Sequence, residues 1–502
     1  MSKIFDELAP YLERAKAFEA ALVLFEWDSA TLAPEESREA TAPVIGVLAD
    51  QYFRTLINDE VKDLLKKLET EEEQKELTDL EKSIVKELKK SYEEMEVVPP
   101  EEYREFSELT TRAAGIWEKA KENADFKEFE ETLGRIVELR KKFIGYRYDA
   151  NKHANPYDVL LNDFEPGFTV EKLDEFFDLI KKELVPFIKE VLEQSKDVDK
   201  SYNSLSYSVD KQKEFSKFLA EYIGFDFNRG VMAESAHPFT TNLHNRDVRI
   251  TNHYYENNLE SSIFSVIHEG GHGIYEMQIA DEITTTIVGG GASMGMHESQ
   301  SRFYENIVGR SEAFWKPIYG KLQEIYPEQL GEVSLEQFIK GINKPEAGFI
   351  RTEADELTYS LHVLIRYEIE KMLFNNEIEV KDLPKVWNEK YNEYLGVMPK
   401  DDAEGVLQDV HWSGGMFGYF PSYALGSAVA AQIYYYMQKE MNLDEVMEKG
   451  DLTEIKKFLG EQIHQYGKTK TTNEMLKAMT GEEFNPDYYI TYLKEKFTKI
   501  YL

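Results

Sequence analysis

The strongest chemical signal in the chain is a pair of histidines four residues apart. His268 and His272 flank Glu269 and two glycines, and the run from Ser261 to Ile279 has the apolar spacing of a helix. Residues i and i+4 lie on the same helix face, so both imidazoles can reach one metal ion. Glu269 follows the first histidine directly and can act on a metal-bound water. This pattern is typical of zinc hydrolases with two His ligands and a Glu general base.

The ordinary alternative is a core helix with two hydrogen-bonded histidines. Glycines at positions 270, 271 and 273 argue against it, because each costs a helix interior roughly 1 kcal/mol relative to alanine. Close approach of a substrate or of neighbouring backbone would explain such glycines.

A catalytic zinc site also needs a third protein ligand and an open position. Tyr275 and Gln278 stand where the extended metzincin motif requires Gly and His, so that form is absent. The candidate ligand lies at the start of a second helical run, expected from Glu298 to Val308. Spacing favours Glu298 only modestly over the preceding His297, and both remain open on this ground.

Composition limits the classes of function. The 502 residues include 59 Lys and Arg against 94 Asp and Glu, a net charge of −35, which argues against nucleic-acid and anionic-membrane partners without excluding a local positive pocket. There is no cysteine, so a metal site must use His, Asp and Glu; this donor set accepts Zn²⁺, with Co²⁺ or Mn²⁺ as substitutes. The charged, amphipathic start and the lack of cysteine predict a cytoplasmic protein.

Helical periodicity dominates the first half of the chain. Apolar residues recur every three or four positions over 74–95, 126–146 and 170–194. Alternation around 247–255 predicts a short strand, placed at a sheet edge. The run 410–438 has no charged residue, but its glycines and polar residues favour a buried loop followed by a core helix over a membrane span.

These patterns predict a mainly α protein. We expect one large helical body over residues 1–502, with a small β element. Residues 1–230 form a mostly architectural half, 231–430 carry the chemical motifs, and 431–502 add C-terminal helices.

Six motifs, in order, carry a family resemblance. They are His237-Pro238-Phe239, the run 247–251, the two-histidine run 268–272, His297-Glu298-Ser299-Gln300, the run 350–355 and the run 405–412. With these, and with the similar run 417–426, the chain resembles the carboxypeptidase Taq family of metallocarboxypeptidases. The resemblance implies the mostly helical architecture of zinc peptidases with a deep active-site groove, and a homodimer. It also implies removal of single C-terminal residues with broad specificity, proline disfavoured. It assigns metal ligation to His268, His272 and Glu298, and the general base to Glu269.

A carboxypeptidase must bind a free carboxylate, which suits the planar fork of arginine. Arg351 is the first candidate because the family motif places it at the site, and Arg249 on the expected strand is the second. For either, the alternative is an ion pair with Glu353, Asp355 or Asp247, which lie nearby in the sequence.

Aromatic and histidine side chains in the other motifs complete the expected site. His411, Tyr419 and Tyr423 lie in a glycine-rich loop and are candidates to stabilise an oxyanion or hold the substrate, with His411 and Tyr419 favoured. His237 is expected to shape the groove wall, with an ordinary surface or core histidine as the alternative. Asp409 is expected to orient a histidine.

The sequence therefore predicts a metallocarboxypeptidase that acts on peptides with a free C-terminus. One rival is an endo-acting oligopeptidase built on the same zinc helix. The other is a catalytically silent binding protein that keeps the fold.

Overall fold

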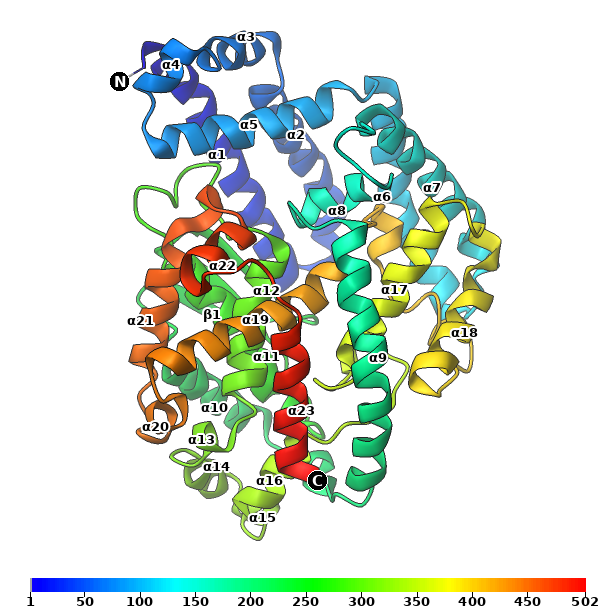
Figure 1. Ribbon diagram of the computed structural model, residues 1–502, viewed down its shortest axis with the longest axis vertical. Helices are drawn as coiled ribbons and strands as arrows, with labels where there is room; N and C mark the ends of the chain where they lie inside the picture. Colours follow the sequence, from blue (N-terminus) through cyan, green and yellow to red (C-terminus); the bar gives the residue numbers. More distant parts are fainter. Residues whose placement is uncertain (1) are drawn as a thin grey trace.

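The computed structural model describes residues 2–502 (Figure 1). It is mainly α-helical with one three-stranded sheet, which confirms the predicted fold class. The helices of the first half are α1 (Lys3–Thr31), α2 (Arg38–Leu56), α3 (Asp59–Leu68), α4 (Glu71–Glu76), α5 (Asp79–Glu96), α6 (Pro100–Glu122), α7 (Lys127–Arg147), α8 (Asp158–Phe164), α9 (Val170–Ser195) and α10 (Val209–Ile223).

The motif-bearing region follows α10. Its elements are β1 (Gly230–Glu234), β2 (Thr240–His244), β3 (Asp247–Asn252), α11 (Leu259–Met277), α12 (Met294–Arg302), the π-helix η3 (Phe303–Val308), α13 (Glu312–Trp315), α14 (Tyr319–Ile325), α15 (Pro327–Leu330), α16 (Leu335–Ile342), η4 (Arg351–Glu353), α17 (Tyr359–Phe374), α18 (Leu383–Leu395), η6 (His411–Gly414) and α19 (Pro421–Glu440). The chain ends with α20 (Leu443–Glu448), α21 (Thr453–Gln462), η7 (His464–Thr469), α22 (Thr472–Thr480) and α23 (Asp487–Tyr501).

Two of the three expected N-terminal helices are confirmed as α7 and α9, but the third is divided. Thr78 starts α5 with a capping box: its hydroxyl accepts from the backbone N–H of Glu81 at 3.2 Å, and the Glu81 carboxylate accepts from the N–H of Thr78 at 2.7 Å. The apolar stripe continues across this break, so periodicity alone did not reveal that α4 ends before α5 begins.

The hydrophobic core joins distant parts of the chain. The main buried cluster extends from Ile84 in α5 to Phe497 in α23, and a second cluster lies among α1, α3 and α5. In Figure 1, α1–α5 gather at one end of the molecule, while α9 runs along its length beside α23. An ion pair of 2.6 Å between Glu183 of α9 and Lys494 of α23 joins these two helices.

The sheet has the order β1-β3-β2, so β3 is its central strand and the prediction of an edge strand is wrong. β3 pairs parallel with β1 and antiparallel with β2. Val248 and Ile250 of β3 are fully buried, and β3 packs against α11. The alternating pattern correctly predicted a strand, but the two partners of that strand lie in segments whose own patterns were too weak to predict strands.

Close packing accounts for the three glycines of α11. A Cβ on Gly271 would lie 2.9 Å from the backbone carbonyl oxygen of Gln300, where α12 crosses α11. Cβ atoms on Gly270 and Gly273 would lie 2.5 Å from Ile223 and 2.7 Å from Phe225. The expectation of closely approaching backbone is therefore confirmed at Gly271, whereas side chains occupy the space beside the other two.

The uncharged run 410–438 folds as expected into a loop with η6 and then the buried helix α19. Over residues 2–502, no helix combines the length and the apolar character needed to cross a membrane.

The crossing of α11 and α12 can be tested with paired glycine substitutions. Gly271→Ala places a methyl group against backbone that cannot move independently, so we expect the free energy of unfolding to fall by about 1–3 kcal/mol. Gly134→Ala in α7, where nothing lies within 4 Å of the new Cβ, is expected to raise it by up to about 1 kcal/mol through helix propensity alone. Denaturant unfolding of both variants checks this, and equal effects would contradict the packing argument.

Candidate metal centre

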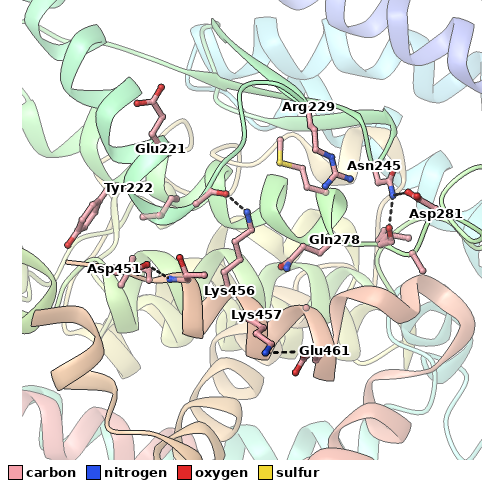
Figure 2. Close-up of a pocket in the computed structure, with 18 of the residues that line it drawn as sticks. Glu221, Tyr222, Arg229, Asn245, Gln278, Asp281, Asp451, Lys456, Lys457 and Glu461 are labelled. Atoms are coloured by element: carbon pink, nitrogen blue, oxygen red, sulfur yellow. Dashed lines mark hydrogen bonds and ion pairs between the residues drawn. The ribbon is translucent and has the colours of Figure 1, made fainter. Parts of the chain in front are cut away.

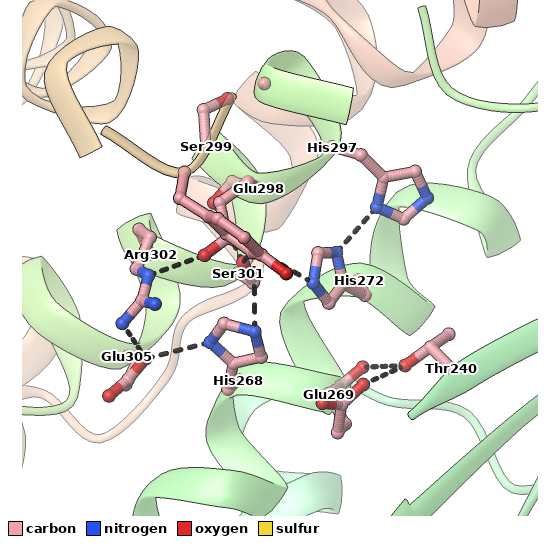
Figure 3. Close-up of polar contacts among 12 residues, drawn as sticks. Thr240, His268, Glu269, His272, His297, Glu298, Ser299, Ser301, Arg302 and Glu305 are labelled. Carbon is pink, nitrogen blue, oxygen red and sulfur yellow. Dashed lines mark hydrogen bonds and ion pairs between the residues drawn. The ribbon is translucent and has the colours of Figure 1, made fainter. Parts of the chain in front are cut away.

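Three side chains from two crossing helices converge on one point (Figure 3). The Nε2 atoms of His268 and His272 in α11 lie 3.6 and 3.4 Å from Oε2 of Glu298 in α12. The three potential ligand atoms are all within 4.8 Å of one another. Two imidazoles and a carboxylate at this spacing fit a divalent ion that keeps a further position open.

A second layer of polar side chains orients both imidazoles. His268 Nδ1 donates to Glu305 at 2.8 Å, so its Nε2 faces Glu298. Nδ1 of His272 lies 2.6 Å from Nδ1 of His297, whose Nε2 lies 2.7 Å from Glu276. The chain of bonds is consistent if His272 donates to His297 and His297 donates to Glu276. Such outer partners hold metal-binding histidines in one tautomer and one ring orientation. The structure thus brings Glu298 to the ligand atoms and puts His297 behind a ligand.

At Glu298 and His272, the surroundings favour the charge states that metal ligation requires. Burial disfavours a charged Glu298, but Arg302, whose Nε donates to Oε1 at 2.7 Å, and His268 hold the pKa of Glu298 well below its usual range. The bond from Arg302 leaves Oε2 for the two histidines. Burial lowers the pKa of His272 to about 3, which favours the neutral imidazole that can bind a metal.

Glu269 lies beside this cluster but is not one of the three candidate ligands. Its carboxylate is buried, and Oε2 accepts from the hydroxyl of Thr240 in β2 at 2.6 Å (Figure 3). Burial raises the pKa of Glu269, which makes it a better proton acceptor than an exposed carboxylate. The edge strand of the sheet therefore sets the position of this group.

Arg351 is buried on η4 and pairs with an unexpected acid. Its Nε and Nη2 donate to Asp409 at 3.0 and 2.8 Å, and Nη1 donates to Tyr359 at 3.1 Å. Asp409 also accepts from Arg366 at 2.7 Å. The expected role of Asp409 in orienting a histidine is therefore wrong. The expectation that Arg351 pairs with an acid close to it in the sequence is also wrong. Two guanidinium groups share one carboxylate, so this cluster keeps an excess positive charge.

His411, Tyr419 and Tyr423 form one aromatic group beside Arg351. The ring centroids of His411 and Tyr419 are 5.4 Å apart, and Nε2 of His411 lies 3.3 Å from the Tyr423 hydroxyl. The Arg351 guanidinium lies 4.8 Å from the centroid of the Tyr423 ring. Burial lowers the pKa of His411 to about 4 and raises that of Tyr419 to about 12, so near neutral pH the imidazole is uncharged and the phenol retains its proton.

Tyr359 joins this group to the metal centre. Its hydroxyl accepts from Arg351, and its ring lies 4.3 Å from the guanidinium carbon of Arg302, which binds Glu298. The predicted ligands and the predicted carboxylate-binding arginine are therefore parts of one connected structure.

Two predicted substrate residues lie apart from this structure. Arg249 forms a two-point ion pair with Asp247 at 2.8 and 2.9 Å, and its guanidinium lies 5.6 Å from the ring of Trp27. His237 has an exposed side chain. Among residues 2–502, neither forms a hydrogen bond or ion pair with a candidate metal ligand.

The residues that sequence reasoning missed are the outer partners. They are Thr240, Glu276, Arg302, Glu305 and Arg366. Part of the signal was present in the spacing: Arg302 follows Glu298 by four positions, and Glu276 follows His272 by four, so each shares a helix face with a ligand.

A mainly helical body with a His-His-Glu centre defines a metal-dependent peptidase, and the comparisons agree. The family described as carboxypeptidase Taq (M32) metallopeptidase matches residues 7–497, so the chain belongs to this family. Carboxypeptidase 1 of Bacillus subtilis is 44% identical, with 99% of this chain and 98% of that protein covered. The protein is a metallocarboxypeptidase, a peptide hydrolase that depends on a divalent metal.

Solved structures show the same fold. The structure of Pyrococcus furiosus carboxypeptidase has a TM-score of 0.95 at 34% identity, with 99% of each chain covered. Trypanosoma cruzi metallocarboxypeptidase 1 has a TM-score of 0.94 at 35% identity, with the same coverage of both chains.

The outer layer can be tested through metal affinity. Glu305→Gln removes the charged acceptor of the His268 N–H, so we expect the affinity for Zn²⁺ to fall about 10- to 100-fold. Competition with a chelator measures this, with the exposed Glu328→Gln as the matched control. Unchanged affinity in a folded Glu305→Gln protein would show that this contact does not orient a ligand.

Proposed function

We propose that this chain releases single C-terminal residues from peptides at a zinc centre held by His268, His272 and Glu298. The convergence of their three ligand atoms within 4.8 Å, with both imidazoles oriented from behind, carries the proposal. Co²⁺ and Mn²⁺ fit the same donor set. A bound ion of this kind polarises a peptide carbonyl and acidifies a water molecule.

Glu269 is the general base in this proposal. The Thr240 hydroxyl fixes one carboxylate oxygen, and the buried setting favours proton uptake. Glu269 would accept the proton of the attacking water and then pass it to the leaving amine.

Arg351 is proposed to bind the terminal carboxylate of the peptide. The pairing of Arg351 and Arg366 with the single carboxylate of Asp409 leaves positive charge in a buried setting, where an ionic hydrogen bond is strong. Arg249 remains the second candidate, although its ion pair with Asp247 supports a structural role. Fixing the peptide terminus makes the enzyme an exopeptidase and disfavours the rival oligopeptidase.

The aromatic group supplies the remaining polar contacts. His411 and Tyr419 are proposed to donate to the oxygen that becomes negative during attack, and Tyr423 to hold the substrate beside Arg351. Nδ1 of His411 has no hydrogen-bond partner within residues 2–502, which supports a role toward substrate. His237 is proposed only as a groove-wall residue.

The proposal extends to the domain organisation, the oligomeric state and the location of the protein. The continuous core supports one peptidase domain over residues 1–502, in which 231–430 carry the chemistry and 431–502 add C-terminal helices. The homodimer rests on the family resemblance, and a cytoplasmic location rests on the cysteine-free composition.

The role of Glu269 can be tested by a single isosteric change. Glu269→Gln keeps the shape but cannot take up a proton, so we expect kcat to fall about 10²- to 10⁴-fold with bound zinc retained. Peptide hydrolysis and metal content are measured together, with the exposed Glu282→Gln as control. A Glu269→Gln enzyme as fast as wild type would refute the mechanism.

Carboxylate recognition is tested with one peptide prepared as free acid and as C-terminal amide. Mass spectrometry should show single-residue losses from the free acid only. Arg351→Gln should lower kcat/KM for the free acid about 10- to 100-fold, because a charged hydrogen bond is lost. The difference in kcat/KM between the free acid and the amide should therefore become smaller.

Arg249→Gln is the matched control and should leave the gap between the free acid and the amide intact. Internal cleavage of both peptides by the wild-type enzyme would instead support the oligopeptidase. No cleavage by the metal-loaded enzyme would favour the silent binding protein.

A further inference from the structure

A cavity of about 920 Å³ lies beside the metal centre. Its walls come from α5, from α8 and the segments flanking it, from the segment 291–297, and from the segment 468–474. His297 lines the cavity and contacts His272 at 2.6 Å. Phe164 lines it as well and packs edge-to-face on Tyr419, with ring centroids 5.1 Å apart. The cavity therefore ends one side chain away from the proposed catalytic residues.

The charge of this cavity is opposite to that of the protein. Eight Lys and Arg residues line it against five Asp and Glu, an excess of three positive charges, whereas the whole chain carries −35. Three of these lysines, Lys86, Lys468 and Lys470, form no ion pair within 4.0 Å among residues 2–502, although Lys86 and Lys470 interact electrostatically with Glu474 at longer range. The ammonium group of Lys470 instead lies 3.4 Å from the centroid of the Tyr466 ring.

These lysines come from two distant parts of the chain. Lys86 lies on α5, whereas Lys468 lies in η7 and Lys470 between η7 and α22, almost 400 residues later in the chain. Several of the cavity acids are already engaged: Glu94 and Asp163 bind Arg147, and the Glu474 carboxylate accepts from the backbone N–H of Thr471. The lining of the cavity therefore keeps a net positive charge.

A second large cavity lacks this excess of positive charge. It has a volume of about 860 Å³ and lies at the C-terminal end of α11, beside Gln278 (Figure 2). Three Lys and Arg residues line it against four Asp and Glu. The excess of positive charge found at the metal centre is therefore absent from this second cavity.

We propose that this cavity binds the part of the peptide that precedes the released residue, and that it selects peptides with Asp or Glu there. A strongly negative protein repels acidic peptides at long range, and a local cationic cavity offsets this repulsion and attracts them to the site. The proposal rests on the carboxypeptidase activity of the family and is independent of which arginine binds the terminal carboxylate.

The test compares two free-acid peptides that differ only in Glu or Gln at the second to fourth positions before the C-terminal residue. At about 20 mM ionic strength, kcat/KM of the wild-type enzyme should be about five- to tenfold higher for the Glu peptide. The ratio should approach one near 0.5 M salt, because the screening length then shrinks to a few ångströms. Equal rates at low salt, or a ratio that salt does not change, would overturn the proposal.

Two triple variants separate the cavity from the net charge. Lys86→Gln, Lys468→Gln and Lys470→Gln together should reduce the Glu/Gln ratio to below about two. The control combines Lys182→Gln, Lys385→Gln and Lys457→Gln, whose side chains are 77%, 79% and 70% exposed elsewhere, and should keep the wild-type ratio. If both triple variants lose the preference for the Glu peptide equally, the preference comes from the overall charge of the protein, and the proposed role of the cavity is wrong.

A third variant shifts the preference in the opposite direction. Glu87 lines the cavity, so Glu87→Gln should increase the Glu/Gln ratio above that of wild type. This result does not depend on the stability of the triple variant. A lower ratio would contradict the proposal, and release from neither peptide would contradict the carboxypeptidase activity itself.

Discussion

The buried carboxylate of Glu298 is the interaction on which the rest of the site depends. A charged carboxylate is costly to bury unless it is paired, and here Arg302 binds one oxygen while two imidazoles face the other. To bring this group to the histidines, α12 must cross α11 at backbone contact, which only a glycine at 271 permits. On its other side, a Cβ on Gly426 of α19 would lie 2.6 Å from the Glu298 side chain. Three helices thus enclose one carboxylate.

The pairing of Arg302 with Glu298 also fixes side chains further from the metal centre. Arg302 also donates to Glu305 at 3.1 Å, and Glu305 accepts from His268, so one guanidinium fixes both a ligand and the partner of another ligand. The π-helix η3, in which Glu305 lies, follows α12 directly, and π-helical turns occur often at functional sites. Through Tyr359 the network continues to Arg351 and Asp409, so the metal centre and the proposed carboxylate site are held by one set of buried charges.

What could be predicted from the sequence is what local spacing determines. The i,i+4 histidines, the intervening glutamate and the long amphipathic helices α7 and α9 follow from periodicity within one element. The division of α4 from α5 could not be predicted in this way, because the apolar stripe continues across the capping box that starts α5. The partner of Arg351 was also missed: Asp409 lies 58 residues away, and only tertiary packing chooses it over the acids at positions 353 and 355. Glu298 and His297 could not be separated by spacing, because which of two adjacent side chains faces α11 depends on how the helices cross.

The N-terminal half does more for the site than its regular helical pattern suggests. Glu165, just after α8, is buried and accepts a hydrogen bond from the backbone N–H of Gly295 in the first turn of α12. Burial raises the pKa of Glu165 to about 7, so the contact is maintained against a desolvation cost. It fixes the start of the helix that carries Glu298 three residues later. Residues of this half also form one wall of the cationic cavity. Residues 1–230, which the sequence predicts to be mostly architectural, therefore help to position a proposed metal ligand and line the proposed path of the substrate.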